Sequence, residues 1–250
     1  MQEAKCEEVY IYLLDVTRMN GTVYTDLTGA FLTTSARGNK YICIAYSYDA
    51  NVILFETMKS KHDSEMLRVF DKFYRKLTSR GIKPTFHVMD NEASSASMDW
   101  LQRVKQVDAQ KVSPHNHREN VAERMIETGK HHLISVIAGT DENFPITQWD
   151  ILIPQTQKTL NMMRPCRINP KLSADAFLEL QHDYNAVPFS PLGWRILIFE
   201  GLDQRSSWGF HAIEGYSIGP AEDNYRSYSG LVTSTGAVRI SDTVVFFPPQ

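Results

Sequence analysis

Three segments rich in β-forming residues follow one another along the chain, and an amphipathic helix and a fourth such segment come next. The first three are Val23–Leu27, Tyr41–Tyr46 and Asn51–Glu56, and only four residues separate the second from the third. Such spacing is typical of strands joined as antiparallel hairpins, whereas a helical crossover brings the chain back parallel to a neighbour. The order of these segments therefore predicts an α/β core built on a mixed sheet.

The crossover helix is predicted from apolar residues that recur at helical spacing over residues 66–77, with Pro84 beyond its end. Thr85–Asp90 is then expected as a strand parallel to a neighbour. A further strand is predicted around Gln110–Val112. Helices are predicted over Ser95–Val104, His117–Ile137, Ile146–Met163 and Ser173–Gln181.

After Pro188 the pattern changes to short β-rich segments between Gly, Ser and Asp turns. They are Trp194–Phe199, His211–Tyr216, Tyr225–Tyr228, Val238–Ile240 and Val244–Phe246. Spacing of this kind is typical of a small β-barrel or sandwich. We therefore expect an upstream segment over 1–19, a core over 20–165, a linker with a short helix over 166–188, and a small barrel-like β module over 189–250.

Composition places the chain among globular proteins. Of its 250 residues, 42% are hydrophobic and 22% are charged, which excludes a disordered chain. The N-terminus lacks the basic-then-apolar order of a signal peptide, and no apolar run reaches the roughly 18–20 residues of a membrane span. An intracellular protein without a membrane partner is expected. Cys6, Cys43 and Cys166 are far apart and form no CxxC pair, so we expect ordinary buried thiols and not a disulfide framework or zinc site.

The formal net charge of −3 is not the basic balance typical of a nucleic-acid-binding protein. Between Lys59 and Lys83, however, eight Lys or Arg residues stand against three acids. Two interpretations of this segment are open at the level of sequence: a patch that contacts phosphates, or a solvated helix face.

Three acids are candidates for one metal site. Asp26 lies inside a β-rich segment, where Asp is depleted, and Asp90 ends the strand expected beside it. Two carboxylates on adjacent strands repel each other unless a cation lies between them. Glu123, 33 residues after Asp90, lies beside the apolar stripe of the long helix and can point at the same cation. Each acid taken alone would be read as a surface residue, so the combination carries the hypothesis.

The segments around these acids resemble the three acidic motifs of integrases from copia-type LTR retrotransposons. The similar segments are Thr25–Phe31 with Gly38–Tyr41, Met89–Glu92, and Ser113–Arg124, in which Glu is followed by Arg. Trp149–Asn161, Arg167–Pro170, Gly215–Pro220 and Val238–Phe247 resemble the segments after the core of such integrases. The resemblance covers roughly residues 20–248.

This resemblance implies an RNase H-like fold, a mixed five-stranded sheet with helices on both faces, and a DDE polynucleotidyl transferase that is part of a Gag-Pol-type polyprotein. It implies 3′-end processing of element cDNA and strand transfer into target DNA, with two Mg²⁺ or Mn²⁺ ions. Asp26 would hold both ions, and Asp90 and Glu123 one each. DNA, a homo-oligomer and a nuclear integration step are implied as well. The expected DNA-contacting residues are Asn116, His117, Arg118, Asn120, Arg124 and Lys130.

The chain departs from the family pattern in two places. Glu119-Asn120 stands where Asn-Gly is usual, which adds a carboxylate near the expected DNA, and the zinc-binding region that normally precedes the core is missing. Glu119 and Glu127 lie on the same helical face as Glu123. Glu119 suits the helix N-terminus for structural reasons, and Glu127 is one turn too far along the helix. Glu123 is therefore the preferred ligand.

The sequence also raises several other functions. His115–His117 spells the letters of HNH nucleases without their extended motif, and the adjacent His131 and His132 cannot both face one metal from a helix. A ribonuclease H shares the fold, and a cut-and-paste transposase shares the acids. The remaining alternative is a catalytically inactive or domesticated DNA-binding module derived from an integrase.

Overall fold

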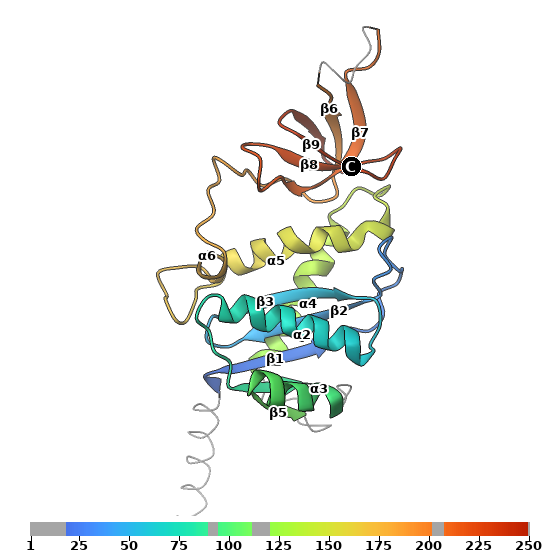
Figure 1. Cartoon of the computed structure of the whole chain (residues 1–250). Coiled ribbons are helices and arrows are strands. Elements are labelled where there is room, and N and C mark those ends of the chain that lie inside the picture. Colours follow the sequence, from blue (N-terminus) through green and yellow to red (C-terminus); the bar gives the residue numbers. More distant parts are fainter. Residues whose placement is uncertain (1–18, 90–94, 112–120, 202–207, 250) are drawn as a thin grey trace, which may run out of the picture. The chain divides into compact units, whose positions relative to one another are not determined.

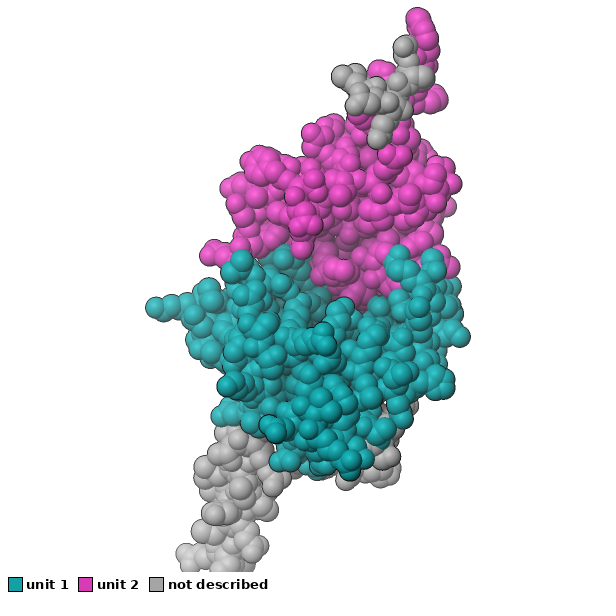
Figure 2. Space-filling view, in the orientation of Figure 1, with its two compact units in different colours: residues 1–130, 157–180 teal, residues 131–156, 181–250 magenta. Residues whose placement is uncertain are grey.

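The computed structural model describes residues 19–89, 95–111, 121–201 and 208–249 (Figure 1). The chain divides into two compact units, one of residues 1–130 with 157–180 and the other of residues 131–156 with 181–250 (Figure 2). The division passes within the helices α4 (Val121–Ala138) and α5 (Ile153–Met162). The domain boundaries expected from sequence remain predictions.

The first unit contains a five-stranded mixed sheet in the order β3-β2-β1-β4-β5. Its strands are β1 (Thr22–Leu27), β2 (Tyr41–Ser47), β3 (Val52–Met58), β4 (Phe86–Met89) and β5 (Asp108–Lys111). The first three pair antiparallel, whereas β4 lies parallel to β1 and β5 parallel to β4. The crossover from β3 to β4 contains the helix α2 (Asp63–Thr78). This arrangement confirms the predicted mixed sheet.

Helices cover both faces of the sheet. On one face, α2 lies against the sheet (Figure 1). It buries Val69, Phe70 and Phe73 in a core shared with β-strand residues such as Val23 and Leu54. The alternate side chains of the strands face the other way, where α4 packs. A Cβ added at Gly129 of α4 would lie only 3.1 Å from Phe55 Cζ and 3.2 Å from Ile53 Cγ2. The glycine therefore lets α4 approach β3 closely, and the predicted helices on both faces are confirmed.

The free edge of β3 is capped by side chains of α5. The Ile53 N–H donates to Asn161 Oδ1 at 2.9 Å, and Asn161 Nδ2 donates back to the Ile53 carbonyl at 2.7 Å. One turn earlier, Gln157 Oε1 accepts from the Phe55 N–H at 2.8 Å. An uncapped edge strand would offer these groups to another chain. The amide side chains close this edge and fix α5 alongside β3.

Shorter helices complete the first unit. The helix α3 (Ser95–Trp100) continues into a π-helical turn η1 (Leu101–Lys105), and α6 (Ala174–Leu178) falls within the range predicted for a short helix. The strand expected near Gln110–Val112 begins earlier, as β5.

The second unit contains a five-stranded antiparallel sheet in the order β10-β6-β7-β8-β9. The strands are β6 (Arg195–Phe199), β7 (Ala212–Pro220), β8 (Tyr228–Val232), β9 (Val238–Ser241) and β10 (Val244–Phe247). Ile196, Ile198 and Val232 form its buried cluster. The sheet is compatible with the predicted small β module. Among the described residues, no helix is long and apolar enough to cross a membrane.

Two predicted elements differ from the structure. The strand expected over Tyr225–Tyr228 starts only at Tyr228, because Asn224–Ser227 form a turn in which Arg226 has a φ of 53°. The single helix expected over Ile146–Met163 is a 3₁₀ helix, η2 (Ile146–Leu152), followed by α5. Pro154 lacks an N–H and is tolerated only in a first helical turn, which is where the start of α5 places it.

The basic residues of α2 are matched by acids. The ion pairs are Arg68–Glu65 at 2.8 Å, Lys72–Glu56 at 2.6 Å, Arg75–Asp71 at 2.7 Å and Lys76–Glu179 at 2.5 Å. Of the two interpretations of this segment, the solvated helix face is therefore favoured.

Replacing Asn161 with Ala is expected to destabilise the first unit. The change leaves the buried N–H and carbonyl of Ile53 without their side-chain partners, which costs about 2–6 kcal/mol at about 1–3 kcal/mol per buried polar group. Chemical denaturation monitored by circular dichroism measures the loss. The control is Asn169→Ala at an exposed position, which should change the free energy of unfolding by less than about 0.5 kcal/mol. Equal stabilities of the two variants would contradict the capping role of Asn161.

Candidate functional site

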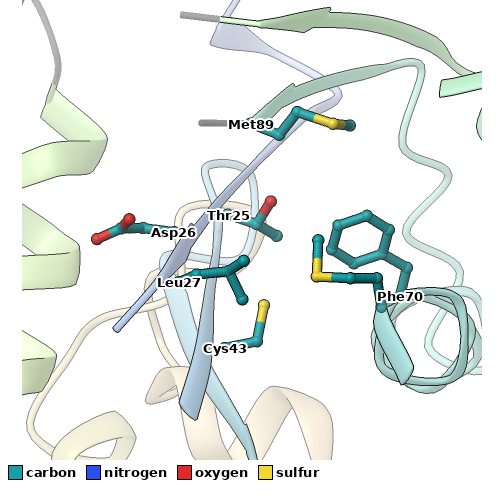
Figure 3. A pocket seen from close by; sticks show the side chains of 7 residues that line it. Thr25, Asp26, Leu27, Cys43, Phe70 and Met89 are labelled. Carbon is teal, nitrogen blue, oxygen red and sulfur yellow. The ribbon is translucent and has the colours of Figure 1, made fainter. Parts of the chain in front are cut away.

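Asp26 lies in the middle of the sheet and faces the α4 side. It is the fifth residue of β1 and pairs with Ile44 of the neighbouring strand β2. Because side chains alternate along a strand, its neighbours Thr25 and Leu27 face α2. Figure 3 shows the Asp26 carboxylate directed away from Cys43 and Phe70, which lie on the α2 side. An acid on the central strand is thus directed away from the apolar core.

A cation from α4 pairs with this carboxylate. Lys130 Nζ donates to Asp26 Oδ2 at 2.6 Å. The two side chains are 36% and 29% exposed, so the pair is partly screened by water. The predicted contact of Lys130 with a DNA phosphate stays a prediction, and in this structure its ammonium contacts Asp26. The contact demonstrates that a positive group fits at the Asp26 carboxylate.

Glu123 lies on the same face of α4 as Lys130. They are seven positions apart, which corresponds to a rise of roughly 10 Å and to nearly two complete turns. Glu123 and Glu127 are both exposed, and so is Arg124. Among the described residues, no group of three His, Cys, Asp or Glu side chains is close enough together to hold a metal ion.

Several predicted site residues fall outside the described residues. They are Asp90, Asn116, His117, Arg118 and Asn120. The chain is described up to Met89, which pairs with Thr25 in the parallel register of β1 and β4. The described part of the chain therefore contains Asp26, Glu123, Arg124 and Lys130 of the predicted set, and it brings Asp26 and Lys130 into contact.

Behind Asp26, a buried histidine ties three elements together. His87 of β4 hydrogen-bonds through Nε2 to Thr25 Oγ1 at 2.8 Å and through Nδ1 to the Tyr74 hydroxyl at 3.1 Å. Its ring packs on Phe70 with 4.9 Å between centroids. Burial lowers the pKa of His87 to about 3, so the ring is neutral at ordinary pH. The network locks the register of β1 against β4 beside Asp26.

No role of His87 is predicted from the sequence. The available signal was a titratable residue within a segment otherwise read as a strand of the sheet core. Because its partners Thr25 and Tyr74 are 62 and 13 residues away, spacing along the chain did not identify the network.

The α2 side of Asp26 contains a small cavity. Its volume is about 10 Å³, which is room for one water molecule at most. Thr25, Leu27, Cys43 and Met89 are among the side chains that line it (Figure 3). Burial raises the pKa of the Cys43 thiol, and the negative charges of Asp26 and Glu56 add to the rise. The thiol is therefore protonated, as expected for an ordinary buried cysteine, and Cys166 is buried as well.

Comparisons with known proteins give similarities to solved structures. No protein-family model and no curated protein matches the chain. Among solved structures, the chain is similar to the HTLV-2 integrase catalytic core domain, solved in complex with magnesium in a trimeric form. The TM-score is 0.45 at 16% sequence identity, over 64% of this chain and 97% of that chain. This similarity is too low to carry a functional argument, so the proposal below rests on the residues themselves.

Protonation of His87 is expected to make stability fall as the pH decreases. Above its usual pKa of about 6.5 the ring is neutral in both folded and unfolded chains, whereas between about 6.5 and 3 only the unfolded chain takes up the proton. The group therefore contributes stability that is lost at up to about 1.4 kcal/mol per pH unit below pH 6.5. His87→Gln should be less stable than the wild type at pH 7, and the difference should narrow by about 2 kcal/mol at pH 5.

Urea denaturation of both proteins at the two pH values measures this narrowing. The exposed His62 provides a matched control, since His62→Gln should leave the pH dependence of the wild type unchanged. A stability difference between His87→Gln and the wild type that is the same at pH 7 and pH 5 would show that His87 is not kept neutral by the fold.

Proposed function

We propose that this chain is the catalytic core and C-terminal part of a retrotransposon integrase that processes and joins DNA ends by metal-dependent phosphoryl transfer. The observation that carries the proposal is the Asp26 carboxylate, which lies on the central strand of the sheet, faces the α4 side and is held by the Lys130 ammonium at 2.6 Å. The parallel strand β4 runs beside it, and Met89, its last residue, directly precedes Asp90 in the chain.

The residues fit a site for divalent cations of the Mg²⁺ type. Such ions prefer carboxylate oxygens, and Asp26 already accommodates a positive group. Asp26 would hold both ions, with Asp90 and Glu123 as the further ligands, as the resemblance to copia-type integrases implies. When bound, two ions would activate the attacking oxygen and stabilise the leaving oxygen of the phosphodiester.

The protein's own side chains would orient the DNA and neutralise its charge, and they would form no covalent bond with it. The thiol nearest to Asp26 along the sheet, Cys43, is fully buried, and its raised pKa keeps it protonated. His87 is buried on the α2 side with both ring nitrogens engaged, so it cannot reach a substrate. Water in the first reaction, and a DNA 3′-hydroxyl in the second, would therefore attack the phosphorus directly and in line.

Lys130 would take a second position in the working enzyme. A cation bound at Asp26 repels the ammonium, and the long Lys side chain can then turn to an anion nearby. A DNA phosphate at the same site supplies that anion. This is how the observed ion pair and the predicted DNA contact of Lys130 would both occur.

DNA ends and target DNA would be the partners, and a homo-oligomer is required for concerted joining. Two ends need two sites of phosphoryl transfer, and one chain provides one set of the three acids. The β sheet of the second unit exposes Val238, Ile240 and Val245, which would suit contacts with another subunit.

A second candidate is an inactive or domesticated DNA-binding module. It is favoured by the Lys130–Asp26 pair, which neutralises Asp26 without metal. The two candidates differ in their response to Mg²⁺. An intact metal site should raise the melting temperature when Mg²⁺ is added, because the ion binds only the folded chain. A decayed site should not.

The first functional test is disintegration, the reverse of strand transfer, on a branched DNA in Mg²⁺ or Mn²⁺. Asp26→Asn and Glu123→Gln should each reduce the rate to about 1% of wild type or less, because a lost ligand removes several kcal/mol of transition-state stabilisation. Glu127→Gln makes the same chemical change one turn along α4 and should keep most of the activity.

Two other results of this test would change the assignment. Loss of activity in Glu127→Gln, together with retention in Glu123→Gln, would transfer the ligand role to Glu127. An inactive wild type that is folded and binds DNA would favour the inactive module.

Removing the Lys130 ammonium should strengthen metal binding. Lys130→Met keeps the aliphatic stem and removes the charge that competes for Asp26. Mn²⁺ affinity should rise about two- to fivefold, because a partly exposed ion pair contributes about 0.5–1 kcal/mol. Titration of Mn²⁺ followed by electron paramagnetic resonance measures the change without substrate. Asp26→Asn is the control and should abolish this binding, and an unchanged affinity in Lys130→Met would contradict the competition.

A further inference from the structure

We propose that Arg164 and Arg167, held over Tyr46 and Tyr48, form a binding site for a backbone phosphate of duplex DNA. The choice of DNA as the ligand rests on the proposed function, whereas the anion site rests on the contacts described next. Neither arginine belongs to the set expected to contact DNA from the sequence.

The two guanidinium groups are positioned by a shared set of partners. Both lie over the ring of Tyr46, at 5.8 and 5.9 Å from its centroid, and Arg167 also lies 4.1 Å from the centroid of Tyr48. Arg164 Nε donates to the Asn51 carbonyl at 2.9 Å, and its Nη2 donates to Asn51 Oδ1. Nη1 of Arg167 donates to the Tyr46 hydroxyl at 2.7 Å and to the Tyr48 carbonyl. Such contacts fix the side chains before any ligand binds.

Two like charges are thereby brought together without a matching acid. Among the described residues, no carboxylate forms an ion pair with either arginine. Asp49 lies in the same turn as Tyr48 and Asn51, but both of its oxygens accept from the Gly21 N–H, at 2.9 and 3.1 Å. Burial lowers the pKa of Arg164, Tyr46 opposes this, and the charge of Arg167 lowers it further. The pair therefore repels itself, and an anion would relieve that repulsion.

The basic residues of α2 differ from this arginine pair in having acidic partners. Arg68, Lys72, Arg75 and Lys76 each have a carboxylate within 2.8 Å. Arg164 and Arg167 have only neutral partners within the described ranges, and these leave Nη1 of Arg164 and Nε and Nη2 of Arg167 available as donors. A phosphate group matches the planar, forked donors of arginine better than it matches a lysine.

The arginine pair lies on the same side of the sheet as Asp26. Tyr46 pairs with Tyr24, which is two residues before Asp26 on β1, so the two sites differ by roughly 7 Å along the strand. Arg164 Nη2 also contacts Met125 Sδ at 3.0 Å, and Met125 lies on α4 between Glu123 and Lys130. A DNA strand that reached Asp26 would therefore bring its neighbouring phosphates within reach of the arginines.

Direct binding of a fluorescent DNA duplex, in EDTA and without metal, tests the proposal. Arg167→Ala should weaken binding about three- to tenfold and reduce the slope of log affinity against log salt by about 0.9 between about 50 and 200 mM salt, as expected for one lost phosphate contact. Arg75→Ala is the matched control, because it removes the same charge from an exposed arginine already paired with Asp71. It should change the affinity less than about twofold.

A second variant separates binding from folding. Arg167→Gln keeps a donor for Tyr46 and Tyr48 but removes the charge, so it should lower the DNA affinity like Arg167→Ala while its melting temperature stays that of the wild type. Wild-type affinity in both Arg167 variants would overturn the proposal. So would an equal loss in Arg75→Ala, which would indicate a diffuse charge effect.

The same assay distinguishes this inference from the proposed catalytic function. Asp26→Asn should bind the duplex at least as tightly as the wild type in EDTA, because it removes a negative charge near the DNA. If catalysis is absent while DNA binding still depends on Arg167, the phosphate site is supported and the catalytic function is not. If the protein is catalytically active while Arg167 has no effect on DNA binding, the catalytic function is supported and the phosphate site is not.

Discussion

A carboxylate on the central strand of a sheet must meet a positive charge or water, and the Asp26–Lys130 pair satisfies this requirement here. The pair depends on how closely α4 approaches the sheet. Gly129, next to Lys130, has no side chain to keep the helix away from Ile53 and Phe55. The capped edge of β3 in turn fixes α5 beside the same strand. The position of Lys130 relative to Asp26 thus depends on how closely α4 packs against β3.

The two faces of β1 have opposite chemistry, and this confines any reaction to one of them. On the α2 side, Thr25 and Leu27 line a cavity of about 10 Å³, and the nearby titratable groups are kept neutral by burial. On the α4 side, Asp26 is partly exposed and already bound to a cation. The neutral His87 network contributes by holding β1 and β4 in register, so that the ends of the two strands are fixed with respect to each other.

Much of the first sheet could be predicted from sequence because its rules are local. Short connections give antiparallel pairs and the crossover helix gives a parallel one, and the observed order follows from these two facts. The contact of Lys130 with Asp26 spans 104 residues, and no periodicity reports on it. The start of β8 at Tyr228 was missed because Tyr225 and Tyr228 have the same β propensity, whereas the turn at Arg226 decides the boundary. Spacing alone also could not choose between Glu123 and Glu127, which lie one turn apart.

Net charge does not describe the local charges of this chain, because folding redistributes them. The basic residues Arg68, Lys72, Arg75 and Lys76 of α2 are paired with acids, so their field is largely cancelled a few ångströms from the surface. On the α4 side, Lys130 is held by a carboxylate, and Arg164 and Arg167 are held by neutral groups. If divalent ions take over Asp26, Lys130 is released at the moment when the site can accept a phosphate. A chain with a net charge of −3 can then bind a polyanion, because the local field at the site decides binding and the total charge does not.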